Sequence, residues 1–296
     1  MTSAIRTRLA PAKVNLFLHV LGRRTDGYHE LDSLVVFADI GDRLSVTPAR
    51  EVTALALTGP FAGALADTPP TDNSVARAAG GLAALHVAMR EAPPAPIHIT
   101  LEKILPVAAG LGGGSADAAA AIALLCEAWD FDPGVAALAA LAGRLGADVP
   151  VCLAGTPARM RGIGERLEPV EVPALDLLLV NPGVPLSTRA VFEALSPAEY
   201  SGPAPDRPLA DFFGWLAATR NDLEGPARRL CPPIDAALAG VAAAPGCRLA
   251  RLSGSGPTVL GLFGSAEEAR AAARALAAAH PDWWIRAAST RLSRNE

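Results

Sequence analysis

A glycine-rich run at residues 110–115, Gly-Leu-Gly-Gly-Gly-Ser, is the part of the sequence whose residue types most directly suggest chemistry. An alanine-rich run that predicts a helix follows it directly. Glycine lets the backbone turn sharply and approach a ligand closely. The N-terminus of a helix offers unpaired N–H groups and the positive end of its dipole to an anion. Taken alone, the run fits either a phosphate cradle or a flexible connection.

No lysine follows these glycines, so the run is not the common P-loop, and it does not give the dinucleotide-binding glycine pattern between a strand and a helix. Among 26 basic residues, only Lys13 and Lys103 are lysines. A lysine kept among so many arginines indicates a position that needs a compact ammonium group. For Lys103 we expect chance retention. Lys13 has polar neighbours that favour a chemical role.

The residues around Lys13 alternate in the manner of a half-buried strand over positions 5–20. Lys13 and Asn15 therefore lie on the same face of that strand, two residues apart. A solvated strand lysine would give the same pattern. The loop at residues 22–29 then ends in Asp26-Gly-Tyr-His29.

Periodicity and turn signals give the elements that must position these residues. Strands are expected at 5–20, 31–40, 42–58 (after a turn at Gly41-Asp42), 97–104, 157–170, 176–180, on both sides of a turn at 252–257, and at 283–289. Helices are expected from Asp72 or Asn73 to Met89 and at 115–128, 135–145, 188–195, 208–219, 222–230, 234–243 and 265–280. Residues 147–150 are expected to be a short turn, because Pro150 cannot continue the preceding helix. The mixture predicts an α+β fold with two domains, residues 1–160 and 161–296.

Composition excludes several classes of protein. The net charge is −4 with no basic stripe, which argues against a nucleic-acid partner. No apolar run reaches membrane-spanning length, and no apolar stretch follows the N-terminal charges, so we expect no membrane partner, no signal peptide and a cytoplasmic enzyme. The four cysteines (Cys126, Cys152, Cys231 and Cys247) are scattered, as buried reduced thiols are. The oligomeric state is open between monomer and homodimer.

Four segments carry a resemblance to a known family: Pro11-Ala-Lys13-Val-Asn15, the glycine run, Gly146-Ala-Asp148-Val-Pro150 and Leu252-Ser-Gly-Ser-Gly-Pro257. Each alone has an ordinary explanation, such as a turn carboxylate for Asp148. Together they resemble the three ordered motifs of the GHMP kinases, which include galactokinase, homoserine kinase and mevalonate kinase. The resemblance implies an N-terminal domain like ribosomal protein S5 domain 2, a ferredoxin-like C-terminal domain and an active site between them.

The element Asp26-Gly-Tyr-His29 narrows this resemblance to the kinases that act on 4-(cytidine 5′-diphospho)-2-C-methyl-D-erythritol. They phosphorylate its C2 hydroxyl with ATP in the methylerythritol phosphate route to isoprenoid precursors. Another GHMP kinase such as homoserine kinase is the first alternative, although an amino-acid substrate offers no base to stack. A non-catalytic nucleotide-binding relative is the second, and the presence of both Lys13 and Asp148 counts against it.

The resemblance assigns roles that agree with the residue chemistry. Phosphoryl transfer needs alignment and charge stabilisation. Asp148, an ordinary ionised carboxylate, would accept the proton of the substrate hydroxyl. Lys13 would pair with Asp148 and stabilise charge on the attacking oxygen and the γ-phosphate. Asn15 would bind the hydroxyls of the polyol, and Mg²⁺ would accompany ATP, with Ser115 within reach of phosphate or metal.

The residues expected to bind ATP lie at a helix start, in the glycine run with its upstream flank, and in the serine-glycine turn: Asn73, Ser74, Leu105, Pro106, Val107, Ala108, Ala109, Gly110, Leu111, Gly112, Gly113, Gly114, Ser115, Ser253, Gly254, Ser255 and Gly256. Asn73 and Ser74 could instead be a plain helix cap. Related sequences often carry more glycine at Ala108-Ala109. Alanine still donates its N–H there, so phosphate binding survives if both residues have φ below zero.

The residues expected to bind the cytidine end are aromatic or polar. Tyr28 would stack on cytosine and His29 would read its edge. By resemblance, Phe192 would stack on the other face of the base, with Thr188 nearby. A loop tyrosine that shields the core and a phenylalanine in a helix core are the alternatives for Tyr28 and Phe192.

Overall fold

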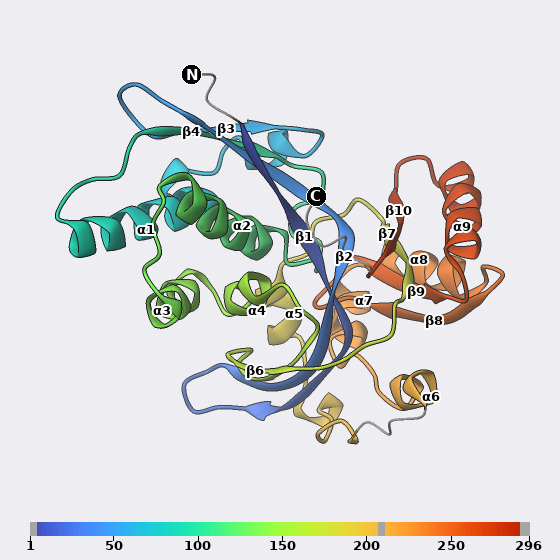
Figure 1. Ribbon diagram of the computed structural model, residues 1–296. Coiled ribbons are helices and arrows are strands. Elements are labelled where there is room, and N and C mark those ends of the chain that lie inside the picture. Colours follow the sequence, from blue (N-terminus) through green and yellow to red (C-terminus); the bar gives the residue numbers. More distant parts are fainter. Residues whose placement is uncertain (1–4, 207–210, 291–296) are drawn as a thin grey trace. The chain divides into compact units, whose positions relative to one another are not determined.

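The computed structural model describes residues 5–206 and 211–290 (Figure 1). These residues form two compact units, each made of segments that are separated along the chain. Unit 1 holds Ile40–Val107, Gly112–Gly155 and the residues up to Ala12, and unit 2 holds Lys13–Asp39, Ala108–Leu111 and the residues from Thr156 onward. The expected division at residue 160 stays a prediction. Of the described helices, none combines the length and the apolar character needed to cross a bilayer.

Two long paired strands, β1 (Arg6–Arg23) and β2 (His29–Pro48), contribute residues to both units and are drawn in blue in Figure 1. The expected turn at Gly41-Asp42 is wrong, because β2 continues through it. A Cβ at Gly41 would lie 2.0 Å from the carbonyl oxygen of Ala10. This glycine therefore permits a close approach of two backbones, a use of glycine that resembles a turn signal in the sequence.

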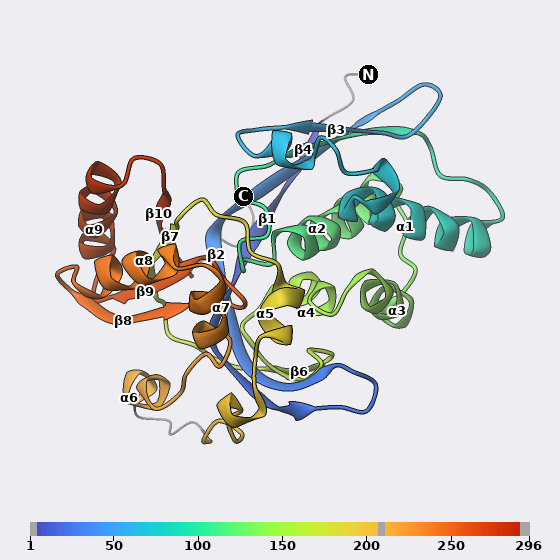
Figure 2. The same ribbon diagram turned by 180° about the vertical axis from the view of Figure 1, so that it is seen from behind.

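In unit 1, β4 (Ile97–Glu102) pairs antiparallel with the second half of β2 and parallel with β3 (Ala54–Thr58). Four helices gather beside these strands (Figure 2): α1 (Ser74–Arg90), α2 (Gly113–Ala128), α3 (Val135–Leu145) and α4 (Val149–Ala154). Small alanine side chains fill most of the buried face of α2 and let its neighbours pack closely.

The expectation of only a turn at residues 147–150 is wrong, because the helix α4 begins at Val149. Pro150 stands in the first turn of α4, where its missing N–H has no intrahelical partner to lose. It ends one helical pattern and begins another. As expected, α3 stops at Leu145 before Gly146.

In unit 2, β5 (Ala158–Gly162) pairs with the first half of β2, and β6 (Arg166–Pro169) pairs with β5. A separate sheet has the order β10–β7–β9–β8 with every neighbour antiparallel; its strands are β7 (Asp176–Asn181), β8 (Cys247–Leu252), β9 (Val259–Phe263) and β10 (Trp284–Ser289). The helices α8 (Pro233–Ala242) and α9 (Ala266–Ala279) pack on it. This βαββαβ arrangement confirms the expected ferredoxin-like fold.

Three short helices and a 3₁₀ turn connect β7 to α8: α5 (Thr188–Glu193), η3 (Pro197–Glu199), α6 (Phe212–Ala217) and α7 (Glu224–Leu230). The helix expected at 208–219 begins later in the structure, at Phe212, and residues 208–210 of that prediction lie outside the described residues. The side chain of Asp211 accepts a hydrogen bond from the N–H of Gly214 and so marks the start of α6.

Candidate functional site

Two helix N-termini lie together in unit 1. Asn73 caps α1 by accepting the N–H of Val75 at 2.9 Å, as the sequence alternative proposed. A Cβ at Gly114 would lie 3.7 Å from Ser74 Oγ, so the first turns of α1 and α2 are neighbours. No side chain caps the start of α2. Unpaired N–H groups of α2 and the positive ends of two dipoles therefore meet, an arrangement suited to an anion.

Ser115 and Asp148 also belong to unit 1. Ser115 stands in the first turn of α2, and its hydroxyl makes no hydrogen bond with the described residues. Asp148 precedes α4, which packs against α2, and its side chain does not cap α4. Its partner in the sequence prediction, Lys13, belongs to unit 2, and their pairing stays a prediction.

A buried charge cluster in unit 1 was missed by sequence reasoning. Lys103, only 3% exposed, donates to Asp117 Oδ2 at 2.7 Å and to Asp42 Oδ2. The other oxygen of Asp42 accepts the N–H groups of Ile104 and Leu105 at 2.6 and 2.8 Å. Chance retention of Lys103 is therefore wrong. Its charge joins β2, β4 and α2, and the one available signal was that the chain has only two lysines.

This cluster, Asp42, Lys103 and Asp117, lies next to the start of α2. A Cβ at Gly113 would come within 3.6 Å of both Asp42 Oδ2 and Lys103 Nζ. Burial, reinforced by the nearby Asp42, raises the pKa of Asp117 to about 7 despite the opposing effect of Lys103. Asp117 Oδ1 is buried without a hydrogen-bond partner among the described residues. The cluster positions the N-terminus of α2 by binding it to the end of β4.

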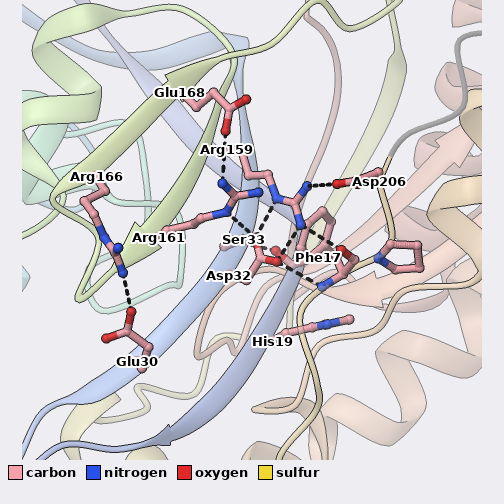
Figure 3. Close-up of polar contacts among 12 residues, drawn as sticks. Phe17, His19, Glu30, Asp32, Ser33, Arg159, Arg161, Arg166, Glu168 and Asp206 are labelled. Atoms are coloured by element: carbon pink, nitrogen blue, oxygen red, sulfur yellow. Dashed lines mark hydrogen bonds and ion pairs between the residues drawn. The ribbon is translucent and has the colours of Figure 1, made fainter.

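In unit 2, Lys13 and Asn15 begin a buried polar chain. Lys13 Nζ donates to Asn15 Oδ1 at 3.0 Å, and Asn15 Nδ2 donates to Ser33 Oγ at 2.8 Å. The Ser33 hydroxyl then donates to the carbonyl of Phe17 at 2.6 Å (Figure 3). The predicted alternation is confirmed, although this face of β1 is buried and the solvated-lysine alternative is wrong.

The first two residues of the glycine run, Gly110 and Leu111, contact the serine-glycine turn and β1 within unit 2. Ser253 Oγ donates to the Gly110 carbonyl at 3.0 Å, and the N–H of Asn15 donates to the same hydroxyl at 3.2 Å. The N–H of Lys13 donates to the Leu111 carbonyl at 2.9 Å. A Cβ at Gly110 would lie 2.3 Å from the Ser253 carbonyl oxygen, so only glycine fits. Unit 2 thus brings together parts of three of the four segments that carry the resemblance.

Ala108 departs from the expected backbone. Its φ is +52°, whereas Ala109 is not among the residues with positive φ. The condition set for phosphate binding at these two alanines, negative φ at both, is therefore not met at Ala108. A left-handed alanine costs about 1–2 kcal/mol through crowding of its Cβ. The carbonyl of Ala109 accepts the N–H of Thr258 at 3.2 Å, which fixes this bend against the serine-glycine turn.

The helix α5 links the serine-glycine turn to an aromatic group. Thr188, at its start, bonds to Ser255 through the two hydroxyls at 2.8 Å. One turn later, Phe192 stacks on His29 with ring centroids 5.0 Å apart and an interplanar angle of 27°. Tyr28 is 60% exposed and makes no ring contact with the described residues. Of the predicted cytidine residues, the structure brings His29, Phe192 and Thr188 onto or beside α5.

Two buried groups, neither predicted from the sequence, hold the serine-glycine turn in place. Asn221 Nδ2 donates to the carbonyls of Leu252 and Gly254 at 2.8 and 2.7 Å. Arg251 donates to the carbonyl of Leu16 at 2.7 Å, and burial lowers the pKa of its guanidinium to about 10. Both act on carbonyl oxygens that are distant in sequence, which no local pattern reveals.

Family models match two stretches of the chain, the GHMP kinase N-terminal domain at residues 73–156 and the GHMP kinase C-terminal domain at 209–282. A 4-diphosphocytidyl-2-C-methyl-D-erythritol kinase of Cereibacter sphaeroides is 51% identical, over 93% of this chain and 96% of its own length. The kinase of that name from Paracoccus denitrificans is also 51% identical, with 95% and 96% covered. The chain belongs to the 4-diphosphocytidyl-2-C-methyl-D-erythritol kinase family.

Solved structures agree with this family. A crystal structure of 4-(cytidine 5′-diphospho)-2C-methyl-D-erythritol kinase matches with a TM-score of 0.78 at 37% identity, covering 96% of this chain and 98% of that one. Homoserine kinase from Cytophaga hutchinsonii matches with a TM-score of 0.71 at 18% identity, over 99% and 96% of the two chains, and shows the common GHMP fold alone. The 4-diphosphocytidyl-2-C-methyl-D-erythritol kinase family thus accounts for the glycine run, the serine-glycine turn and the order of the elements. The chain is an ATP-dependent small-molecule kinase.

Proposed function

We propose that the protein phosphorylates the C2 hydroxyl of 4-(cytidine 5′-diphospho)-2-C-methyl-D-erythritol with ATP, giving the 2-phosphate and ADP, in the methylerythritol phosphate pathway. The 51% identity to a 4-diphosphocytidyl-2-C-methyl-D-erythritol kinase supports this assignment of the substrate. The observation that carries the proposal is the continuity of unit 2. There α5 connects His29 and Phe192, which suit a pyrimidine base, to a turn that contacts Asn15 and the glycine run.

Asp148 and Lys13 are the proposed catalytic pair. Asp148 takes the proton from the C2 hydroxyl, and the freed oxygen attacks the γ-phosphorus while the bond to the β–γ bridging oxygen breaks and ADP leaves. The ammonium of Lys13 stabilises the charge that develops on the transferred group. Asn15, whose amide is held by Lys13 and Ser33, binds the polyol hydroxyls.

The glycine run and the residues beside it are the proposed ATP site. Asn73, Ser74 and Gly112–Ser115 supply helix N-termini for the nucleotide and its phosphates, with Leu105–Leu111 and Ser253–Gly256 completing the set. Mg²⁺ fits the Ser115 hydroxyl, which has no hydrogen-bond partner among the described residues, because magnesium at such sites takes few protein ligands. The ion would neutralise phosphate charge. We place the enzyme in the cytoplasm, where ATP is supplied and the cysteines, which form no disulfide among the described residues, stay reduced.

A direct assay tests this function. Purified protein, ATP, Mg²⁺ and the cytidine-linked substrate should give ADP and one new phosphomonoester on C2. The appearance of the phosphomonoester is monitored by ³¹P NMR. Turnover with homoserine alone would favour the other GHMP kinases. Nucleotide binding without turnover of either substrate would favour a non-catalytic relative.

Asp148→Asn is the matching variant. It should lower kcat by about 10²–10⁴-fold, the contribution typical of a general base, while ATP still binds. Asp130→Asn is the matched control in the same unit, because asparagine tolerates the left-handed backbone found there at φ +48°. The control should keep the rate of the wild type. An Asp148→Asn enzyme that retains full turnover would remove Asp148 from the role of base.

A further inference from the structure

His29 lies against two aromatic rings of unit 2. Phe192 stacks on it face to face, and Tyr200 meets it edge-on with centroids 6.1 Å apart and an interplanar angle of 81°. Neither ring nitrogen of His29 makes a hydrogen bond with the residues that the structure describes. Ring packing, rather than hydrogen bonding, therefore sets the plane of this imidazole and the direction of its two nitrogens.

Tyr200 is fixed from its N-terminal side by charged contacts. Glu199, the preceding residue, pairs with Arg229 at 2.8 Å and accepts the N–H of Ser196 at 2.8 Å. Arg220 donates to the backbone carbonyl of Glu199, also at 2.8 Å. The hydrogen bond from Arg229, and after it the N–H of Ser196, lower the pKa of the Glu199 carboxyl to about 2. The backbone that enters Tyr200 is thus held by two arginines.

The C-terminal side of Tyr200 is fixed by a buried ion pair. Asp32 and Arg159 face each other with nitrogen–oxygen distances of 2.7 and 2.6 Å (Figure 3). Both also bind Ala204: Asp32 accepts its N–H at 2.9 Å, and Arg159 donates to its carbonyl at 2.8 Å. The N–H of Ser201 donates to the carbonyl of Val20 at 3.0 Å. The segment that follows Tyr200 is therefore clamped to β1, β2 and β5.

We propose that Tyr200 is a positioning residue for base selection, which orients the His29 imidazole so that it reads the edge of cytosine. The proposal rests on the proposed function, since it needs a cytidine-linked substrate. Cytosine presents an amine where uracil presents a carbonyl, so a correctly directed acceptor nitrogen separates the two bases. Burial, with a smaller effect of Arg23, lowers the pKa of His29, and a neutral imidazole can supply that acceptor.

Tyr200→Leu tests the inference, with Tyr200→Phe as the matched control that keeps the ring edge. Tyr200→Leu should raise KM for the cytidine substrate about 3- to 10-fold, the value of one aromatic edge contact. It should lower the preference for this substrate over its uridine analogue by a similar factor, while KM for ATP stays unchanged. Tyr200→Phe should behave as the wild type. A purely structural role would not change the preference between the two bases.

Each result decides one question. If the wild type does not turn over the cytidine substrate, the proposed function fails. If it does, and Tyr200→Leu keeps the wild-type preference for cytidine over uridine, only the role of Tyr200 is overturned. If the Tyr200→Leu variant does not fold, a second measurement on the wild type tests the inference. With five histidines and two tyrosines in the chain, nuclear Overhauser effects between the His29 and Tyr200 rings can be assigned in the wild type. Effects that persist with substrate bound support the proposal, and their disappearance on binding overturns it.

Discussion

The two lysines of the chain are almost equally buried, yet they lie in different surroundings. Lys103 is 3% exposed and donates to two buried carboxylates, Asp42 and Asp117. Lys13 is 5% exposed, and its contact on its own strand is with the neutral amide of Asn15 at 3.0 Å. The charge of Lys103 is countered inside unit 1. Lys13 lies among the proposed substrate-binding residues of unit 2.

This difference indicates a structural role for one buried cation, Lys103, and a role at the proposed site for the other, Lys13. Around Lys103, backbone N–H groups of the chain itself complete the hydrogen bonds of Asp42, so the cluster joins secondary-structure elements to one another. The neighbours of Lys13 include Asn15, which is proposed to bind the polyol, and the glycine run, whose Leu111 carbonyl accepts the N–H of Lys13. We therefore expect removal of Lys103 to act first on stability and removal of Lys13 to act first on rate.

Lys103→Met should give the largest loss of stability. The substitution leaves two buried carboxylates without their cation, and breaking a buried pair in this way costs about 3–5 kcal/mol. Urea unfolding followed by circular dichroism measures the change. The double variant with Asp117→Leu, which removes one carboxylate as well, should recover part of the loss. A loss below about 1 kcal/mol for Lys103→Met would contradict a structural role for the cluster.

Lys13→Met should reverse the order of the two effects. It removes a proposed stabiliser of transition-state charge, so kcat should fall by about 10²–10³-fold. Stability should fall by about 1–3 kcal/mol, since the acceptor Asn15 Oδ1 loses this donor. Steady-state kinetics and urea unfolding, run beside Lys103→Met, test the contrast. A Lys13→Met enzyme with normal kcat and a stability loss equal to that of Lys103→Met would remove the distinction.

Sequence patterns correctly predicted the features that depend only on residues close together in the chain. Alternation placed Lys13 and Asn15 on one strand face, and capping chemistry placed the start of α1 at Asn73. The prediction of a turn at Gly41-Asp42 was wrong because glycine is required for two different reasons in proteins. Both a tight turn and a close approach to another backbone, here that of Ala10, require glycine, and only the three-dimensional pairing of β1 and β2 distinguishes the two.

Candidate-site residues that the sequence did not reveal depend on partners far along the chain. Lys103 is 61 positions from Asp42, and no periodicity relates them. Tyr200 is a half-buried ring whose importance comes from its contact with His29, 171 positions earlier (200 − 29), and from the clamp on Ala204. Motif resemblance found the glycine run, the serine-glycine turn and the aspartate. It gave no information on the residues that hold them.

The pH dependence of stability should distinguish the two lysine regions further. The folded-state pKa of Asp117, raised to about 7 by burial, lies above its ordinary value near 4. The folded protein therefore holds a proton that the unfolded chain releases in this range, so this stabilising contribution is full below about pH 4 and is lost as pH rises through 7. Its slope is at most about 1.4 kcal/mol per pH unit.

Asp117→Asn isolates this contribution, because other carboxylates also titrate. The measured quantity is the difference in unfolding free energy between wild type and variant from about pH 4 to 8. This difference should shift steadily in favour of the variant as pH rises. A constant difference would show that Asp117 stays ionised beside Lys103 over the whole range.

The smallest effect concerns the two alanines that precede the glycine run. Ala108 holds a left-handed backbone at φ +52°, so Ala108→Gly removes a strain of about 1–2 kcal/mol and adds about 0.4–1 kcal/mol of unfolded-chain entropy. The net result should lie between no change and a gain of about 1.6 kcal/mol. Ala109→Gly is the matched control one residue along, without positive φ, and should lose about 0.4–1 kcal/mol. Urea midpoints that move in opposite directions would place the strain at Ala108. If both variants lose stability equally, the bend before the glycine run does not depend on Ala108, and the contact of Ala109 with Thr258 alone holds it.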